Sequence, residues 1–505
     1  MTDTTDLIAP RWKEKLETAL LNPIRAFRLR YLPLLMVYFA YGALGIVTIA
    51  ESFWIKSALT LTPSELAALS VWLTLPWTIK MVFGELVDAV PVMGSQRRAY
   101  VLIGGGLVAL GLLTLAGAAG GWLTFAPPQD LYRLGSFLSV VGVVLQDVTA
   151  DAMSTEVVSR ETPDGTPRDP KDINRDLGMV QVLGRLALSL GMVAVAGLAG
   201  WLASVFSYET VFLCGLVIPL ISISGALMIE IKTPETRPVD WRILGGGIAF
   251  GATVATLAIT GVPYGQEIVF VVSMAVVTAM LWRVVGDLDP RTKEKIFYAA
   301  LIIFAFRATP LVGQGYTWFT IDVLGFDEAF QGTLNQIGAL LALLGTWFFS
   351  DAITRRPIPV VLFWLTIAAS LLSVPSLALT LGISTWTEAM FGFGARTIAV
   401  IDTAASSPLL QLSMIPLLTL CAIYAPEKRR ATWFALMGSL MNLALVAGAL
   451  QTKYLNQILV VDRGSYENLP LILGLVMAIG LVVPLTAILL FGRKLNEETA
   501  GARAT

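Results

Sequence analysis

The feature that most constrains this chain is a long series of apolar segments, each about as long as a membrane is thick. A helix that crosses a bilayer needs about 20 mainly apolar residues, at a rise of about 1.5 Å per residue. Of the 505 residues, 56 % are hydrophobic and only 14 % are charged, which is more apolar surface than a water-soluble chain of this length would bury. We therefore expect an all-α polytopic membrane protein.

Fourteen candidate spans can be placed, in groups of six, two and six. The grouping predicts an amphipathic cytoplasmic segment (1–30), a six-helix bundle (31–230), a linker with two extra transmembrane helices (231–294), a second six-helix bundle (295–491) and a cytoplasmic tail (492–505). The fourteen spans cover about 31–55, 64–84, 99–120, 131–157, 177–203, 208–230, 243–262, 266–286, 295–320, 328–352, 357–382, 400–424, 429–457 and 469–491.

The positions of the lysines and arginines support this count. Positive side chains concentrate in the cytoplasmic loops of membrane proteins. If the chain starts in the cytoplasm and each span crosses once, almost every basic loop falls on the cytoplasmic side. We therefore expect both termini to be cytoplasmic, in a bacterial-type inner membrane and without a cleavable signal peptide. The opposite side keeps only Lys56, Arg133, Arg396, Lys453 and Arg463.

Two six-helix halves are the architecture of the major facilitator class, in which substrate binds near midplane between the halves. The two extra spans carry almost no buried charge, so we expect them to face lipid. The chain has no histidine, and its cysteines lie inside apolar runs. We expect no disulfide, metal site or catalytic set, and hence no enzyme activity. We expect no cofactor and no nucleic-acid partner, and we expect the protein to be a monomer.

Arg307 is the most informative single residue, because ionisable groups in a membrane are costly and usually face a cavity or a partner. It lies near the middle of the span 295–320, shortly before Pro310 and Gly313. This pattern predicts a broken helix, and such breaks expose backbone groups to substrate. We favour substrate contact for Arg307 over the alternative, in which it binds carbonyl groups of a neighbouring helix.

Asp147 and Asp151 are spaced by four residues, so they share one face of their helix. Arg185, on the next span, is predicted at nearly the depth of Asp151, which favours a salt bridge between them. The pair is interpreted as a fixed strut, a gate latch or a proton-coupling site, and the first two are favoured.

Other charges are expected near the ends of the first two spans. Lys80 either contacts substrate or extends to the membrane interface. Glu51 is either solvent-exposed or part of a gate or proton site. Asp88 with Arg97 and Arg98 is expected to form a cytoplasmic latch that controls conformational switching. A shorter version of this charged turn in the second half contains Asp351, Arg355 and Arg356, which suggests that the turn is duplicated.

Aromatic side chains near these charges are candidates for stacking on a flat ligand. Aromatic residues in spans more often pack or anchor the protein at the interface. Both interpretations remain open for Tyr38, Tyr41, Trp77, Tyr316 and Trp318.

Four separated motifs, in order along most of both halves, resemble the folate–biopterin transporter family of the major facilitator superfamily. The resemblance rests on Leu75-Pro76-Trp77-Thr78-Ile79-Lys80 with Asp88 to Pro91 and Arg97-Arg98, on Asp147 to Ala152, on Phe306-Arg307-Ala308-Thr309-Pro310, and on Met414 to Leu418 with Pro426 to Asn442. More distantly, Gln146-Asp147 and the Pro-x-x-x-Lys turn are similar to muropeptide permeases and acetyl-CoA carriers.

The resemblance implies a flat heteroaromatic anion as substrate and proton symport as the driving mechanism. Arg307, with Lys80 or Arg185, would then pair with carboxylates, and aromatic side chains would stack on the ring. Asp147, Asp151 and Glu51 are the candidate coupling carboxylates. The alternatives are a muropeptide, S-adenosylmethionine or a nucleotide-linked metabolite as substrate, or a non-transporting membrane assembly factor built on a carrier fold.

Overall fold

The structure is a computed structural model, and it describes most of the chain apart from the two ends and a few short segments. Side chains inside helices are not described at 170, 174, 259, 346–354, 410–412, 414–415, 422, 430–432 and 496. Most of the predicted N-terminal segment, the end of the tail, Arg355 and the side chain of Asp351 therefore lie outside the described residues. The described residues are 25, 27–92, 94–162, 164–229, 238–286, 288–354, 357–412, 414–423 and 430–496.

Within the described residues every regular element is a helix, and the first group of helices forms the N-terminal half of the molecule. Its elements are η1 (Leu29–Tyr31), α2 (Leu32–Ala43), η2 (Leu44–Val47), α3 (Thr48–Ala58), α4 (Pro63–Thr78), α5 (Lys80–Ala89), α6 (Arg98–Gly120), α7 (Pro128–Glu156), α8 (Pro170–Val205), α9 (Tyr208–Cys214) and α10 (Val217–Leu227).

A helical hairpin, α11 (Trp241–Thr260) and α12 (Gly265–Val284), then leads to the C-terminal half. The C-terminal half contains α13 (Pro290–Arg307), α14 (Gln314–Asp322), α15 (Glu328–Thr354), α16 (Ile358–Leu372), α17 (Val374–Thr380), α18 (Ile383–Phe391), α19 (Ala395–Leu412), α20 (Met414–Ile423), α21 (Arg430–Ile458) and α22 (Leu469–Asn496).

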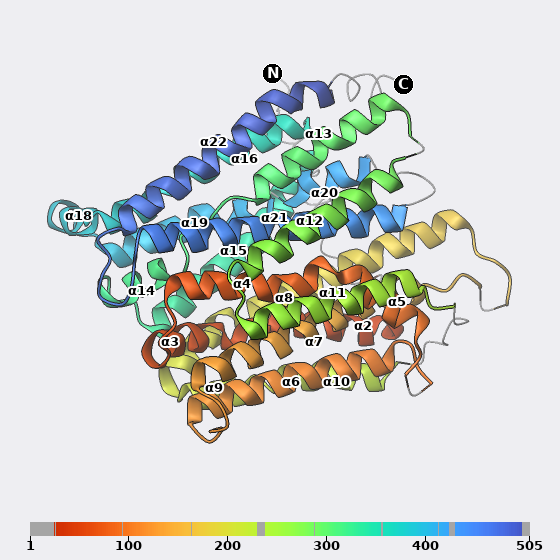
Figure 1. The fold of residues 1–505 in the computed structure, drawn as a ribbon, viewed down its shortest axis with the longest axis horizontal. Coiled ribbons are helices and arrows are strands. Elements are labelled where there is room, and N and C mark those ends of the chain that lie inside the picture. Colours follow the sequence, from red (N-terminus) through yellow and green to blue (C-terminus); the bar gives the residue numbers. More distant parts are fainter. Residues whose placement is uncertain are drawn as a thin grey trace, which may run out of the picture.

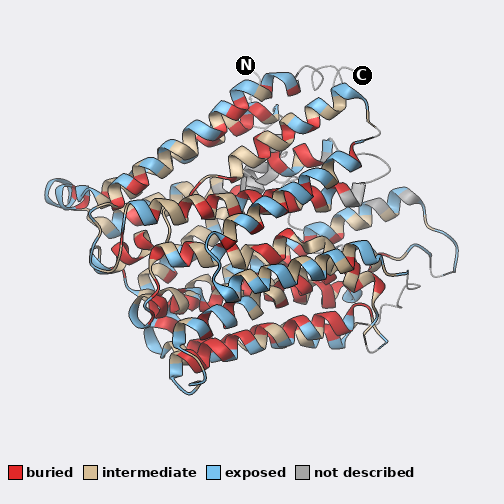
Figure 2. Cartoon of the chain, in the orientation of Figure 1, coloured by how far each residue is buried: buried red, intermediate tan, exposed pale blue. Residues whose placement is uncertain are grey.

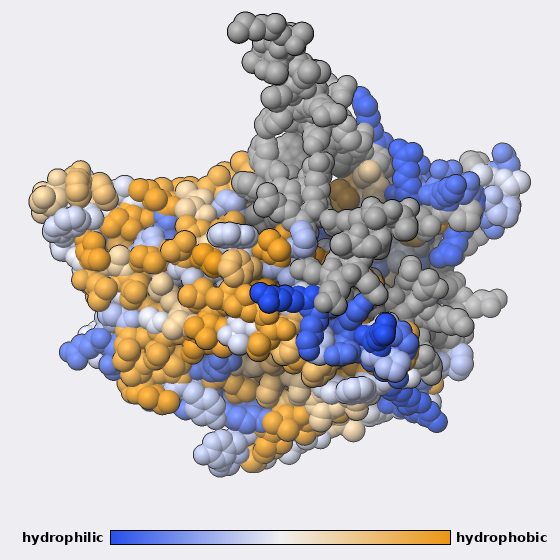
Figure 3. Space-filling model, turned by 90° about the horizontal axis from the view of Figure 1, so that it is seen from above, coloured by the Kyte–Doolittle hydropathy of each residue, from blue (hydrophilic) through white to orange (hydrophobic). Residues whose placement is uncertain are grey.

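Eleven helical stretches of the described chain are long and apolar enough to cross a membrane. The three other predicted spans correspond to α13–α14, α15 and α19–α20. Figure 3 shows apolar side chains over a broad part of one face, as expected for a surface in contact with lipid. The prediction of an all-α polytopic membrane protein is confirmed.

Figure 1 shows the two halves one above the other, with their long helices side by side. Two pairs of helices join the halves, because α4 packs along α21 and α8 packs along α15. At the α8–α15 crossing the backbones touch: a Cβ added to Gly200 would lie 2.5 Å from Cα of Gly332. Small residues at helix crossings allow such close approach.

The predicted break in the helix after Arg307 is confirmed. Helix α13 ends at Arg307 and α14 starts at Gln314. Pro310 cannot donate a helical hydrogen bond, and Gly313 has a φ of 83°, which favours glycine. The second span is also divided, at Ile79, so that Lys80 begins the new helix α5.

The hairpin α11–α12 lies on the seam between the halves. Helix α11 packs on α5, and α12 packs on α21 and α4. Both helices are largely exposed, as the pale colouring in Figure 2 shows, which agrees with a lipid-facing position. The start of α12 is nevertheless bound to both halves, since Gln266 donates to the Ala68 carbonyl (3.1 Å) and Lys453 pairs with Glu267 (2.7 Å).

The helix bundle has two ends, which we call the Arg97 end and the Arg463 end. The Arg97 end carries the loops 90–97 and 157–169, and the Arg463 end carries the loop 459–468 and the turn at Gly121.

Candidate functional site

A cavity of about 790 Å³ lies between the halves, bordered by α4 on one side and by α13, α14 and α21 on the other. Two of the predicted substrate residues, Arg307 and Tyr316, line it. Arg307 reaches the cavity because α13 ends there, and its Nε donates to the Met441 carbonyl at 3.3 Å. The structure thus places a guanidinium group and an aromatic ring on the C-terminal wall of the cavity.

In the N-terminal half, five predicted site residues come together with Tyr38 to form what we call the Lys80 cluster: Tyr38, Tyr41, Trp77, Lys80, Asp147 and Asp151. Lys80 forms an ion pair with Asp147 and a longer one with Asp151 (3.5 Å). The Tyr38 hydroxyl donates to Asp151 at 3.0 Å. Lys80 therefore points toward α7.

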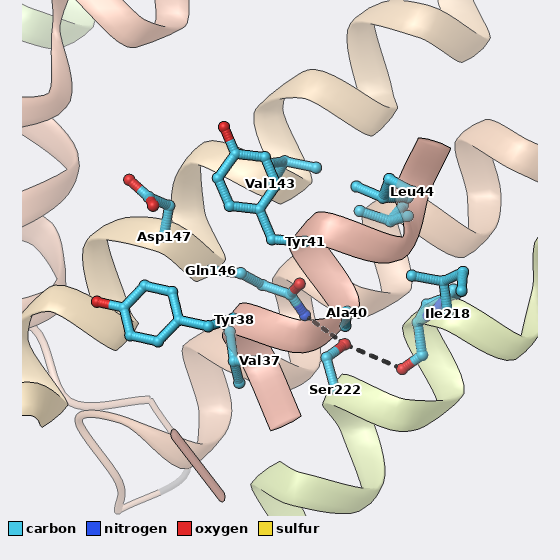
Figure 4. A pocket seen from close by; sticks show the side chains of 12 residues that line it. Val37, Tyr38, Ala40, Tyr41, Leu44, Val143, Gln146, Asp147, Ile218 and Ser222 are labelled. Carbon is cyan, nitrogen blue, oxygen red and sulfur yellow. Dashed lines mark hydrogen bonds between the residues drawn. The ribbon is translucent and has the colours of Figure 1, made fainter. Parts of the chain in front are cut away.

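The aromatic members of the Lys80 cluster extend this polar group. The rings of Tyr41 and Trp77 are stacked, with centroids 5.9 Å apart, and the Lys80 ammonium lies 5.5 Å from the Trp77 ring centroid. Figure 4 shows Tyr38, Tyr41 and Asp147 around a small cavity, with Gln146 beside them. This small cavity has a volume of about 10 Å³, which is room for about one water molecule.

The predicted salt bridge between Asp151 and Arg185 is wrong in this structure. Asp151 instead interacts with Lys80 and Tyr38. The reason is the position of α2, which packs against both α7 and α8. The Tyr38 ring lies directly against Gly184, so it occupies the space through which Arg185 would have to reach. Arg185 is exposed on α8.

The predicted pair of Asp88 and Arg97 is present, with 2.9 Å between Arg97 Nη2 and Asp88 Oδ1. Arg97 is buried and also binds Glu156, with its Nε donating at 3.0 Å, so it joins α5, α6 and α7 within one half. Glu156 was not predicted. Arg98 is exposed, and its main-chain N–H donates to Ser95.

Glu51 lies on α3 and is half-buried, which differs from simple solvent exposure. It lies beside the hydroxyl of Tyr132 on α7. Tyr132 borders the main cavity, so Glu51 is one side chain removed from it.

The Arg463 end holds a set of contacts between the halves that sequence reasoning missed. Arg463 donates to the carbonyl groups of Ile55, Lys56, Leu59 and Leu61 at 2.7 to 3.1 Å. Its guanidinium also lies 4.1 Å from the ring centroid of Trp318, which buries that predicted aromatic candidate in the core.

Asp322 completes this set, because it pairs with Lys56 and accepts a hydrogen bond from Tyr466. We call Lys56, Asp322, Arg463 and Tyr466 the Arg463 gate. One signal was available: Lys56 and Arg463 are among the five basic residues that the topology leaves on the side poor in positive charge. Basic residues that oppose the usual bias have a structural reason to be there.

Comparison with known proteins agrees with these features. The model of the BT1 family matches residues 42–504. A folate-biopterin transporter from Synechocystis is 27 % identical over 446 residues, covering 87 % of this chain and 77 % of the relative. A probable folate-biopterin transporter 4 from Arabidopsis thaliana is 24 % identical, covering 86 % of this chain and 89 % of the relative. The family resemblance is confirmed.

Solved structures show the same fold at low sequence identity. A POT family transporter in complex with 5-aminolevulinic acid has a TM-score of 0.63 at 12 % identity, covering 92 % of this chain and 96 % of the other. A peptide transporter POT in complex with sulfate has a TM-score of 0.60 at 15 % identity, covering 92 % and 94 %. The predicted major facilitator fold is therefore confirmed.

Proposed function

Because the chain belongs to the BT1 family, and is thus a membrane transporter and not an enzyme, we propose that it carries a folate- or pterin-like organic anion by alternating access. The observation that carries this proposal is the cavity of about 790 Å³ with Arg307 and Tyr316 on its wall. Its volume lies within the range of about 300 to 1,000 Å³ typical of small-molecule sites.

The proposed binding mode follows from the chemistry of the cavity wall. A substrate carboxylate pairs with the Arg307 guanidinium, and a flat ring stacks on Tyr316. The Lys80 cluster offers a second cation, but Lys80 already binds Asp147 and Asp151, so a ligand there competes with two carboxylates. We propose this second position for a distal carboxylate of the substrate, with Arg185 as a further candidate cation.

We further propose that the structure represents a state that is closed at the Arg463 end. The Arg463 gate joins α3 to the loop 459–468 across the halves, and α8 and α15 are in contact near the same end through Gly197 and Gln336 (2.9 Å). On the topology predicted above, the Arg97 end is cytoplasmic, together with both termini, in a bacterial-type inner membrane. The substrate then exchanges with the cytoplasm in this state.

Proton coupling is part of the proposal, because transport of an anion into a negatively charged cell needs a driving force. Asp147, Asp151 and Glu51 are the coupling candidates taken from the sequence. Asp147 lines the small cavity, Asp151 lies beside Lys80, and Glu51 lies beside Tyr132 of the main cavity.

The test is uptake of radiolabelled folic acid and of a simple pterin by cells that express the chain, with and without a protonophore. Saturable uptake that the protonophore abolishes supports the proposal. Membrane expression of the Arg307→Ala variant serves as the matched transport-deficient control. If correctly inserted wild-type protein takes up neither compound, the substrate assignment is wrong, and a muropeptide, S-adenosylmethionine or a nucleotide-linked metabolite becomes the next compound to assay.

A further inference from the structure

The carboxylates of the Lys80 cluster are already bound to other side chains of the protein. Asp147 pairs with Lys80, and Asp151 interacts with Lys80 and with the Tyr38 hydroxyl. A proton that binds either carboxylate has to compete with the Lys80 ammonium group for the same oxygen atoms. A carboxylate that no described cation contacts avoids this competition.

Asp402, on α19, is a carboxylate of a different kind. It lies about two turns from the start of α19, and its Oδ2 accepts a hydrogen bond from the Ser376 hydroxyl of α17 at 2.9 Å. Its Oδ1 is buried and has no hydrogen-bond partner among the described residues. A buried, charged oxygen without a partner is costly, whereas a protonated carboxyl removes the charge.

The elements packed on α19 provide no cation for Asp402 in the described part of the chain. Helices α16 and α17 carry no titratable side chain, and α20 offers only Cys421. Glu328 of α15 accepts from Tyr208, while Glu388 lies on α18. Arg396 of α19 itself pairs with Asp327. The side chain of Asp351 on α15 is not described.

Asp402 is connected to the main cavity through Tyr316. The hydroxyl of Tyr316 lies close to the Ser376 side chain, which donates a hydrogen bond to Asp402. Tyr316 also lines the main cavity. Tyr316 belongs to α14, the helix that ends with the gate residue Asp322. The short helix α14 thus carries Tyr316, which connects the cavity to the surroundings of Asp402, and Asp322, which belongs to the Arg463 gate.

We propose that Asp402 is the site that binds the coupling proton, an inference that rests on the proposed function. A proton from water in the cavity binds Oδ1, while Oδ2 keeps its hydrogen bond from Ser376. The carboxyl group stays neutral while the carrier changes conformation, and it then releases the same proton to water on the other side of the membrane. A metal cation would need about six or more oxygen ligands, and Asp402, Ser376 and Tyr316 supply too few, which favours a proton.

The test uses Asp402→Asn in the full-length protein, reconstituted in liposomes with radiolabelled folic acid. Asparagine keeps the size and the acceptor for Ser376 but cannot bind the proton. For one coupled proton, a gradient of about one pH unit supports about tenfold accumulation. The variant is expected to lose this accumulation and yet to retain exchange of external for internal folic acid, since exchange moves no net proton.

The matched control is Asp130→Asn, at a solvent-exposed carboxylate that pairs with Arg133, and it should accumulate folic acid like the wild type. Accumulation by Asp402→Asn would overturn the inference. The inference would also be overturned if Asp147→Asn or Glu51→Gln lost accumulation and kept exchange while Asp402→Asn did not. Accumulation driven by a sodium gradient and not by a proton gradient would also overturn it.

A second measurement does not depend on the substrate. Infrared difference spectra between acidic and alkaline buffer should contain the carboxyl stretching band of a protonated acid in an apolar site, and Asp402→Asn should remove it. If the wild type fails to exchange folic acid but this band is present and is lost in the variant, the proposed substrate is wrong and the proton site stands. A band that survives in Asp402→Asn overturns the proton site.

Discussion

The two halves of the molecule hold charge inside the membrane in different ways. In the N-terminal half two groups of charges come as ion pairs, with Lys80 between two aspartates and Arg97 between Asp88 and Glu156. In the C-terminal half, Asp402 meets a serine hydroxyl, and Arg307 borders the cavity while binding a backbone carbonyl.

This difference suggests a division of labour. Charges that neutralise each other within one half can remain in place through a conformational cycle, so the N-terminal half is suited to be a stable wall. A carboxylate that meets no cation among the described residues, and an arginine at the cavity, respond to what arrives there, a proton or an anion. The predictions below test this division, beginning with the largest expected effect.

Lys80→Ala should destabilise the folded protein by about 3–5 kcal/mol, because it leaves the largely buried carboxylate of Asp147, and with it the exposed Asp151, without a cation. The measurement is thermal unfolding of the purified protein in detergent. Adding Asp147→Asn to this variant should restore part of the loss, since one of the two uncompensated charges is removed. Equal melting temperatures for the wild type and Lys80→Ala would show that the cluster is not a stabilising element.

Arg307→Ala should abolish measurable uptake while the protein still inserts and folds. Loss of a buried charged contact to an anion costs about 2–5 kcal/mol, which is at least about thirtyfold in affinity. Arg307→Lys should be intermediate, because an ammonium group cannot make the bidentate contact. Arg133→Ala, at an exposed arginine, is the control. Undiminished uptake by Arg307→Ala would remove the C-terminal half from substrate binding.

Arg463→Ala should shift the protein toward the state open at the Arg463 end by about 1–3 kcal/mol, as several hydrogen bonds to carbonyl groups are lost. The shift is measured as a change in distance distribution between spin labels on α3 and on the loop 459–468. Arg463→Lys should give a smaller shift, because one ammonium group cannot reach all four carbonyls. Identical distributions in all three proteins would show that the Arg463 gate does not hold the closed state.

The smallest effect is expected at Asp327, outside the spans. The N–H of Phe330, and then the Arg396 guanidinium, hold the pKa of Asp327 below its usual range. A depressed pKa stabilises the folded protein above the unfolded value of about 3.9, and this contribution is lost as pH falls through the folded pKa. The pair is exposed, so Asp327→Asn should lower the free energy of unfolding by less than about 1 kcal/mol above the unfolded pKa. Below the folded pKa the substitution should have no such effect.

Melting temperatures measured over a series of acidic buffers provide this check. A larger change at Asp327 than at Lys80 would contradict the contrast between buried and exposed pairs on which the comparison of the halves depends.

Features that depend on residues close together in the chain could be predicted from the sequence. The break after Arg307 follows from Pro310 and Gly313 a few residues away, and the shared face of Asp147 and Asp151 follows from helical spacing. The length of the apolar runs is likewise local information, and it predicts an all-α polytopic membrane protein. These features need no knowledge of which helices are neighbours.

The features that the sequence did not reveal depend on tertiary neighbours. Arg185 was assigned to Asp151 because α7 and α8 are consecutive, but α2 inserts Tyr38 between them. The carbonyl groups that Arg463 binds lie more than 400 residues earlier in the chain. Asp402 was overlooked because its only described partner, Ser376, is a serine in an apolar run.

The contact between Gly200 and Gly332 has a consequence for how fast such a carrier can work. At the Gly200–Gly332 contact the two helices meet through their backbones, so α8 and α15 can tilt against each other there without separating interlocked side chains. Friction at this pivot should then be low, and the time for one transport cycle should be set by how quickly water replaces the bonds of the Arg463 gate.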